Sequence, residues 1–227
     1  MDRLECIKSL MKKKNLKGYL EIGVSNGHIL FRVKSNFKIA VDPAFFFDNA
    51  RKIGKTFLNP YNLFNRYFRK TSDDFFEQDA PSVFEKRKAE LALIDGMHVY
   101  ELALRDVENT LRYMDEEGVI IMHDCNPQDR AAACSFDEWK ARGFKGAWNG
   151  DVWKTILHLR CLRSDLTVFV LDCDHGLGII TKKRNEKAMH FSMNDIQKLT
   201  YDDFDANRKA WLDLRPAGYF YEYFGLK

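Results

Sequence analysis

The sequence lacks any long apolar segment, and this absence excludes a membrane-spanning helix. No apolar run reaches the roughly 20 residues that a helix needs to cross a bilayer. The opening residues, MDRLECIKSLMKKK, also lack the apolar core of a signal peptide. We therefore expect a cytoplasmic protein that does not have a membrane among its partners.

The sequence also lacks an excess of charge of one sign. Its 36 basic and 33 acidic side chains leave a net charge of only +3. Proteins that bind nucleic acid usually carry a strongly basic stripe, so we expect no nucleic-acid partner. The cysteines are odd in number and form no Cys-x-x-Cys pair, which is typical of reduced thiols in the cytoplasm. They are Cys6, Cys125, Cys134, Cys161 and Cys173.

No repeat and no Pro/Gly-rich linker divides the 227 residues. We therefore expect one domain over residues 1–227, with an N-terminal helix (1–16), a core (17–183) and a helical, aromatic tail (184–227). In the tail, Thr200 is placed as the N-cap of a helix that Pro216 stops. The aromatic end, GYFYEYFGLK, packs either onto the domain or onto a partner subunit, which leaves a homodimer open.

Short apolar runs alternate with longer amphipathic stretches through the core. Alternating strands and helices predict an α/β fold with a doubly wound, mostly parallel sheet covered by helices on both faces. The last two strands are joined by too few residues for a crossover helix, so they should form an antiparallel hairpin, giving seven strands. The expected helices include 2–15, Val99–Met114 and Val152–Leu162. The expected strands are Gly18–Ile22, Phe37–Val41, Arg66–Lys70, Leu91–Ile94, Val119–Met122, Thr167–Leu171 and Gly178–Thr181.

The stretch EIGVSNG, residues 21–27, follows the first expected strand and suggests a ligand that lies against the backbone. In open α/β sheets ligands bind beyond the carboxyl ends of the strands. A helix starting near Ser25 or Asn26 would point its free N–H groups at such a ligand. Glu21 would repel a pyrophosphate and suits a cationic group. As the alternative, Gly23 serves only a turn.

Asp42 ends the second expected strand, where a carboxylate can accept both hydroxyls of a ribose. The alternative is a helix cap before Pro43. Together with EIGVSNG, this acid resembles the motifs of class I S-adenosylmethionine-dependent methyltransferases, over roughly residues 15 to 183. The resemblance implies a Rossmann-like fold and S-adenosylmethionine as cofactor, with the TSDDFF segment flanking its adenine. The cofactor residues so implied are Glu21, Gly23, Ser25, Asn26, Gly27, Asp42, Ser72, Asp73 and Asp95.

Two further motifs lie at the ends of the fourth and fifth expected strands. LALIDGMH ends in Asp95 and His98, and GVIIMHDC contains His123 and Asp124. Adjacent strands lie about 4.8 Å apart, so the two carboxylates can converge, and they would then need a cation or a proton between them. We expect a divalent metal, magnesium or manganese, held by Asp95, Asp124 and His123; an imidazole ligand suits manganese, iron or zinc better than magnesium.

These motifs resemble the metal-dependent O-methyltransferases of the catechol type and of the type that methylates sugar hydroxyls on natural products. The residue that matches His98 is a lysine in the catechol type and a histidine general base in the sugar type. The resemblance therefore implies O-methylation of a sugar or sugar-bearing small molecule, with His98 and Asp95 as catalytic residues. The alternatives are a helix cap for Asp95, an exposed first-turn position for His98 and a core position for His123.

The segment WNGDVWK, residues 148–154, places tryptophans around a helix entry. One interpretation makes Trp148, Asp151 and Lys154 the border of the acceptor pocket; the other makes Asp151 an N-cap beside core aromatics. Two rival functions stay open. One is a nicotinamide-dinucleotide-dependent oxidoreductase on a Rossmann sheet, and the other is a non-catalytic regulatory subunit that binds the cofactor.

Overall fold

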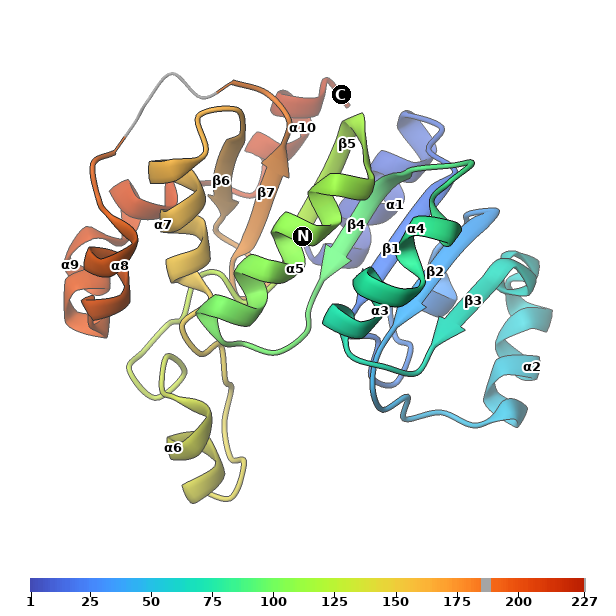
Figure 1. Ribbon diagram of the computed structural model, residues 1–227, viewed down its shortest axis with the longest axis horizontal. Helices are drawn as coiled ribbons and strands as arrows, with labels where there is room; N and C mark the ends of the chain where they lie inside the picture. Colours follow the sequence, from blue (N-terminus) through green and yellow to red (C-terminus); the bar gives the residue numbers. More distant parts are fainter. Residues whose placement is uncertain (185–188, 227) are drawn as a thin grey trace. The chain divides into compact units, whose positions relative to one another are not determined.

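The structure is a computed structural model that describes residues 1–184 and 189–226. In these ranges eight strands form a sheet in the order β3-β2-β1-β4-β5-β7-β6-β8 (Figure 1). The expected α/β class is confirmed, with one strand beyond the seven expected, the two-residue β8. The strands are β1 (Gly18–Ile22), β2 (Phe37–Val41), β3 (Asn65–Phe68), β4 (Ala89–Ile94), β5 (Met114–Met122), β6 (Thr167–Leu171), β7 (Leu177–Thr181) and β8 (Leu214–Arg215).

The helices that connect these strands are mostly short. They are α1 (Arg3–Lys13), α2 (Asn49–Leu58), α3 (Ser72–Gln78), α4 (Ala80–Val83), α5 (Tyr100–Tyr113), α6 (Phe136–Ala141), α7 (Trp153–Leu162), α8 (Met193–Lys198), α9 (Tyr201–Leu212) and α10 (Tyr219–Phe224), with 3-10 turns η1 (Leu30–Arg32) and η2 (Pro60–Phe64). Among the described residues, no helix is long and apolar enough to cross a membrane.

The chain divides into two compact units. The N-terminal unit comprises residues 2–96 and 105–119, and the C-terminal unit comprises residue 1, residues 97–104 and the described part of residues 120–227. Each unit is described by itself below. One domain over residues 1–227 stays a prediction.

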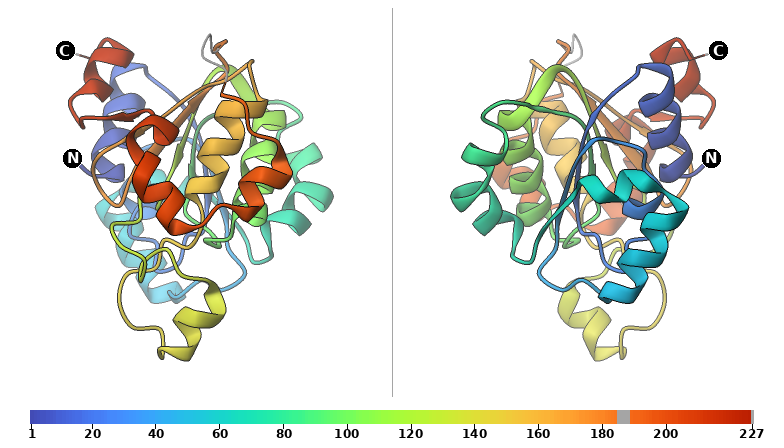
Figure 2. Two further views of the ribbon diagram at one scale, coloured as in Figure 1. Left: turned by 90° about the vertical axis from the view of Figure 1, so that its left-hand side faces the viewer. Right: turned by 90° about the vertical axis from the view of Figure 1, so that its right-hand side faces the viewer.

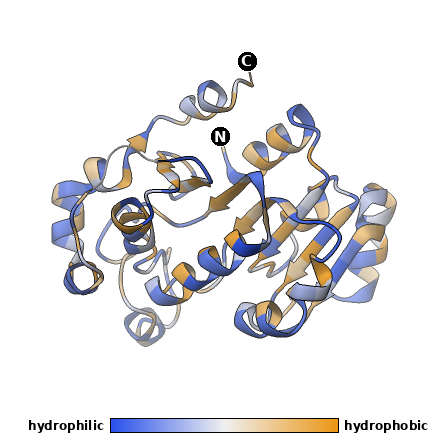
Figure 3. Ribbon diagram, turned by 45° about the horizontal axis from the view of Figure 1, so that its top comes forward, coloured by the Kyte–Doolittle hydropathy of each residue, from blue (hydrophilic) through white to orange (hydrophobic). Residues whose placement is uncertain are grey.

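In the N-terminal unit, β1 pairs in parallel with β2 and with β4, and β2 pairs in parallel with β3. All five residues of β1 are buried, because helices and loops cover both faces of a parallel sheet. Figure 3 shows strands rich in hydrophobic residues and helices that carry both classes. Asp2 caps α1, whose apolar side buries Leu4, Cys6, Ile7, Leu10 and Met11.

In the C-terminal unit, β6 and β7 form the antiparallel hairpin that the sequence predicted, with Thr167 opposite Thr181. Helix α7 packs against α8, α9 and β6 (Figure 2). The Thr200 side chain caps α9, as expected, by accepting a hydrogen bond from the Asp203 backbone. The aromatic tail packs onto its own unit, since the rings of Tyr219 and Tyr223 contact Phe169 on β6.

The segment after β1 contains no α-helix, so the expected helix start near Ser25 or Asn26 is wrong. Ser25 and Gly27 have φ angles of 49° and 74°, in the left-handed region. Two such residues cannot belong to a right-handed helix. The chain instead makes turns and reaches only the 3-10 turn η1, Leu30–Arg32.

Gly23 is fixed by sterics, and this gives a first prediction. Its φ is 81°, and an added Cβ would lie 2.0 Å from the carbonyl oxygen of Asp95. We expect Gly23→Ala to lower the free energy of unfolding by about 3 kcal/mol or more. Urea denaturation measures this, with Gly54→Ala as the control. An added Cβ at Gly54 meets no described atom within 4 Å, so that helical change should stabilise by up to about 1 kcal/mol. Equal stabilities of both variants would contradict the steric argument.

Candidate active site

The predicted cofactor residues lie in the N-terminal unit, where β1, β2 and β4 end at one edge of the sheet. The Gly23 N–H donates to the Val41 carbonyl at 3.0 Å, and the Asp95 N–H donates to the Ile22 carbonyl at 2.9 Å. The Asp42 N–H donates to the Phe68 carbonyl at 3.1 Å. The loops that carry these residues therefore leave the sheet together, at the edge where open α/β sheets bind ligands.

Asp42 braces the glycine-rich turn. One carboxylate oxygen accepts the Ser25 N–H and the other accepts the Ala44 N–H, both at 2.7 Å. The alternative role of Asp42 as a helix cap fails, because α2 begins only after its own N-cap, Asp48. The Asn26 side chain closes a smaller turn by accepting the N–H of His28 at 2.9 Å.

Steric constraints within the fold explain why positions 23 and 27 are glycines. Gly23 lies against the Asp95 backbone, and a Cβ on Gly27 would lie 2.4 Å from the ring of Phe31. Close packing of the chain on itself therefore explains both bare positions. A ligand is not needed to account for them.

Glu21 is buried within β1, and its carboxylate accepts a 2.6 Å hydrogen bond from the hydroxyl of Tyr19. Burial raises the pKa of Glu21 to about 8. The amine of Lys38 in β2 is buried as well and donates to the carbonyls of Leu30 and Val33. Burial lowers the pKa of Lys38 to about 7. The Glu21 carboxyl is therefore mostly neutral at pH 7.

The remaining cofactor candidates lie in α3 and after β4. Ser72 and Asp73 form the first turn of α3, and Asp73 pairs with Arg105 at 2.7 Å. Ser72 hydrogen-bonds Asp106, whose pKa burial raises to about 7. The Asp95 carboxylate lies 3.5 Å from the Arg3 guanidinium.

Burial of Glu21 predicts a pH dependence of stability. The folded state holds the proton up to about pH 8 and the unfolded state only to about 4.5, so stability should fall as pH rises between these values. Lys38, with its pKa lowered to about 7, acts in the opposite direction only above that pH. The difference in free energy of unfolding between Glu21→Gln and the parent should shift in favour of the variant by up to about 3 kcal/mol when the pH rises from about 5 to about 7. Urea denaturation at both values measures this; the exposed Glu77→Gln is the control. Parallel pH profiles of the Glu21 variant and the parent would refute it.

In the C-terminal unit, Asp124 is the centre of a buried polar cluster just beyond β5. Its φ of 60° is left-handed, an uncommon conformation that is often found at functional sites. One carboxylate oxygen accepts from the Asn149 amide at 2.9 Å, and the other accepts from His123 Nδ1 at 2.6 Å. His123 Nε2 lies 3.4 Å from Asp174. Both ring nitrogens of His123 therefore already face carboxylates.

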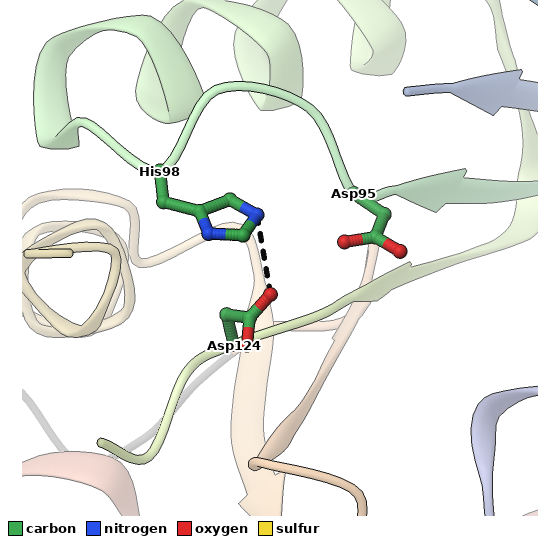
Figure 4. Close-up of side chains that lie close together, drawn as sticks. All are labelled: Asp95, His98 and Asp124. Atoms are coloured by element: carbon green, nitrogen blue, oxygen red, sulfur yellow. Dashed lines mark ion pairs between the residues drawn. The ribbon is translucent and has the colours of Figure 1, made fainter. Parts of the chain in front are cut away.

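His98 also reaches the Asp124 carboxylate, at the oxygen that His123 contacts (Figure 4). Its Nδ1 donates to the Trp148 carbonyl oxygen at 2.6 Å, and its Nε2 lies 3.2 Å from Asp124 Oδ2. Because a carbonyl oxygen only accepts, the Nδ1 position carries hydrogen. Nε2 therefore either shares a proton with the Asp124 carboxylate, in the imidazolium form, or is the unprotonated nitrogen of neutral imidazole.

The tip of the β6–β7 hairpin supports this cluster. Asp174 and His175 both have left-handed φ angles, as a type I′ turn requires. The N–H groups of Cys125 and Asn126 donate to the carbonyls of Gly176 and His175. The hairpin is therefore fastened to the residues after β5, which places Asp174 beside His123.

A pocket of about 230 Å³ in the C-terminal unit has His98 in its wall. The side chain of Asp151 accepts the Tyr100 N–H at 2.7 Å and so caps α5, whereas Val152 precedes α7. The alternative of Asp151 as a cap for the following helix is therefore wrong. The Trp148 ring stacks on Trp139 and contacts His98 without lining the pocket. Other lining residues are Ser135, Phe136, Lys154 and Tyr201.

Sequence reasoning missed Asn149 and Asp174. Asn149 lies inside the conspicuous segment 148–154, but only the fold shows that its amide reaches Asp124. Its other atom, Oδ1, is buried and has no hydrogen-bond partner among the described residues. A buried acceptor left in this state fits a site that receives a water, a cation or a substrate group. Nothing in the sequence around Asp174 distinguished it from an ordinary turn residue.

Residues 20–125 match the family of methyltransferase domains. No curated protein sequence matches the chain. Among solved structures, the chain is similar to the methyltransferase PaMTH1 of Podospora anserina bound to SAH, at 14% identity and a TM-score of 0.56 over 81% of this chain and 80% of that chain.

Two bacterial structures are similar in the same way. The O-methyltransferase TomG of Streptomyces achromogenes, in complex with SAM, has 9% identity and a TM-score of 0.55, with 80% of each chain covered. The O-methyltransferase of Bacillus cereus, in complex with SAH, has 11% identity and a TM-score of 0.54 over 81% of this chain and 82% of that chain. The resemblance that EIGVSNG and Asp42 indicated is confirmed by the family model, which matches residues 20–125, a range that contains both motifs.

Proposed function

We propose that the protein transfers a methyl group from S-adenosylmethionine to a hydroxyl oxygen of a sugar or a sugar-bearing small molecule. The observation that carries the proposal is the pairing of His98 with Asp124 at the wall of a pocket. The family match supports methyl transfer, and similar folds hold SAM or SAH in TomG and the Bacillus cereus enzyme.

The N-terminal unit would hold the cofactor. Each Asp42 oxygen accepts one backbone N–H and keeps a second lone pair, which suits the two hydroxyls of a ribose. Ser72 and Asp73 would flank the adenine. Glu21, Gly23, Ser25, Asn26, Gly27 and Asp95 complete the proposed set.

The C-terminal unit would supply the base. With Nδ1–H held by the Trp148 carbonyl, only Nε2 of His98 can take the proton of the acceptor. The Asp124 carboxylate then stabilises the imidazolium that forms. The acceptor oxygen bonds to the methyl carbon as the carbon–sulfur bond breaks, and the proton passes to His98. S-adenosylhomocysteine is the leaving group and keeps the electron pair of the broken carbon–sulfur bond.

A divalent cation, magnesium or manganese, would be held by Asp95 and Asp124. Asp95 is separated from His98 by only two residues, and Asp95, His98 and Asp124 each offer a ligand atom. The orphaned oxygen of Asn149 fits such a site. When bound, the metal would lower the pKa of a hydroxyl group. His123 is the other proposed ligand, although its contacts suit a residue that orients Asp124.

The acceptor would enter the pocket beside His98. A volume of about 230 Å³ suits a small polar molecule, and a wall containing Phe136, Asp151 and Lys154 offers both aromatic and charged contacts. The Lys154 amine lies 3.6 Å from the Asp151 carboxylate and donates to the Gln197 carbonyl. These two charged side chains of the pocket wall are therefore already paired with each other. Trp148 would act indirectly, because its ring and its carbonyl oxygen contact His98.

Calorimetric titration tests the cofactor. We expect the parent to bind S-adenosylmethionine more tightly than a nicotinamide dinucleotide, and Asp42→Ala to weaken S-adenosylmethionine binding at least about tenfold by losing the ribose contact and the brace on Ser25. Asp48→Ala is the control, because it removes a comparable carboxylate that caps α2. Tighter dinucleotide binding would favour the oxidoreductase. Unchanged affinity in Asp42→Ala would contradict the ribose assignment.

A second experiment separates the roles of His98 and Asp124. After metal is stripped, titration of magnesium or manganese should give a heat that Asp124→Ala abolishes. His98→Ala should keep that heat and S-adenosylmethionine affinity but lose about 100-fold or more in turnover of hydroxylated acceptors. His158→Ala, distant in sequence and hydrogen-bonded to Tyr100, is the control. Loss of the heat in His98→Ala would make His98 a ligand. Cofactor binding without turnover by the parent on a panel of sugar acceptors would favour the regulatory subunit.

A further inference from the structure

The N-terminal unit exposes a group of large apolar side chains that the proposed methyl transfer does not use. Phe57 and Leu58 at the end of α2 are 84% and 80% exposed, and Leu63 in η2 is 75% exposed. We call this group the α2/η2 patch. Its members are Phe46, Ile53, Phe57, Leu58, Tyr61, Leu63 and Phe64. Exposed apolar groups of this kind mark surfaces that contact a partner or a membrane.

The exposure is built into the fold, because polar side chains occupy the positions that face inward. Asn59 and Asn62 are buried, and their amides donate to the Phe31 carbonyl at 3.0 and 3.1 Å. Asn62 also accepts from the buried amine of Lys38 at 2.8 Å. These bonds orient η2 so that the neighbouring Leu63 points outward. Among the residues of α2, none is buried.

A basic cavity of about 650 Å³ adjoins the patch through Tyr61, which belongs to both. Within the described part of the chain, five cationic side chains and no carboxylate line it. Lys8, Lys12 and Lys34 have no ion-pair partner among the described residues, so their charges are available to a ligand. The cationic lining residues are Lys8, Lys12, Lys17, Arg32 and Lys34.

The patch itself lies among positive charges. Residues 46–70 contain six basic residues and one acid, Asp48, and one of the six, Lys70, pairs with Asp79 at 2.6 Å; this leaves a local excess of four positive charges. Of the six, Lys52 lies over the ring of Tyr67, with its amine 4.5 Å from the ring centroid. The six are Arg51, Lys52, Lys55, Arg66, Arg69 and Lys70. This local excess exceeds the net charge of the whole chain, +3.

We propose that this face of the N-terminal unit binds the surface of an anionic lipid bilayer. Exposed apolar side chains on a short amphipathic helix enter the headgroup region, while lysine and arginine attract anionic lipids. The basic cavity receives a phosphate-bearing headgroup. This inference departs from the expectation of no membrane partner, which rested on the absence of a spanning segment.

Charge and chemistry favour a membrane over other occupants. In a twofold dimer the same patch meets itself, so its excess of positive charge would face a like charge. Nucleic acid would use the cations but gains little from the aliphatic side chains of Ile53, Leu58 and Leu63, since it is bound by stacking and charge. An anionic bilayer satisfies both features at once.

Vesicle sedimentation with the whole protein tests the proposal. We expect binding to vesicles of equal parts phosphatidylcholine and phosphatidylglycerol, weaker binding as salt rises, and little binding to phosphatidylcholine alone. Ile53→Ser with Phe57→Ser should weaken binding at least about tenfold by removing apolar insertion. Lys8→Glu with Lys12→Glu should weaken it by a similar factor.

Matched controls come from the C-terminal unit. Leu162→Ser alters another exposed leucine, and Lys209→Glu reverses another exposed lysine; both should bind like the parent. No binding to anionic vesicles would overturn the proposal. Heparin binding that Ile53→Ser with Phe57→Ser leaves unchanged, without vesicle binding, would assign the face to a polyanion. Dimerisation that this pair abolishes, without vesicle binding, would assign it to a second copy of the chain.

Discussion

The carboxylate of Asp124 is the group on which the C-terminal site depends. Asp124 has a left-handed backbone conformation just beyond β5. Its carboxylate contacts its neighbour His123 and brings in Asn149 and His98 from two other segments. A buried carboxylate is stable only when its lone pairs are satisfied, so each of these partners also holds its own segment in place. The arrangement leaves His98 Nε2 beside Asp124, with Nδ1 fixed by the Trp148 carbonyl. The proposed proton transfer to His98 would therefore need no movement of the backbone.

In the N-terminal unit, burial raises the pKa of Glu21 to about 8 and lowers the pKa of Lys38 to about 7. The charged form of each side chain is therefore disfavoured, while hydrogen bonds hold both groups in place. The Asp42 side chain lies at the end of β2, where its two oxygens accept the backbone N–H groups of Ser25 and Ala44. Asp42, the residue proposed to bind the ribose of the cofactor, therefore also holds the glycine-rich turn in place.

The large apolar side chains of α2 and η2 are exposed because two buried asparagines fix the backbone there. Asn59 and Asn62 occupy the inward positions and satisfy carbonyls of residues 31 and 33, so the apolar side chains beside them have no core to enter. Exposing large apolar side chains costs free energy in water, and natural sequences keep such surfaces where something covers them. In the proposed membrane role, the cations around these side chains would favour an anionic surface as the cover.

The sequence by itself determined the α/β class, the strands at Gly18–Ile22, Phe37–Val41 and Thr167–Leu171, the hairpin and the methyltransferase resemblance, because periodicity and short connections are local properties. It could not place Asn149 or Asp174, show the inward asparagines, or foresee that the turn after β1 would not become a helix. Those features depend on contacts between residues far apart in the chain, such as Asn149 with Asp124, and on left-handed backbone at Ser25. Local residue types do not encode such contacts. Tertiary structure decided them, since only folding brings a distant partner close enough to satisfy a buried polar group.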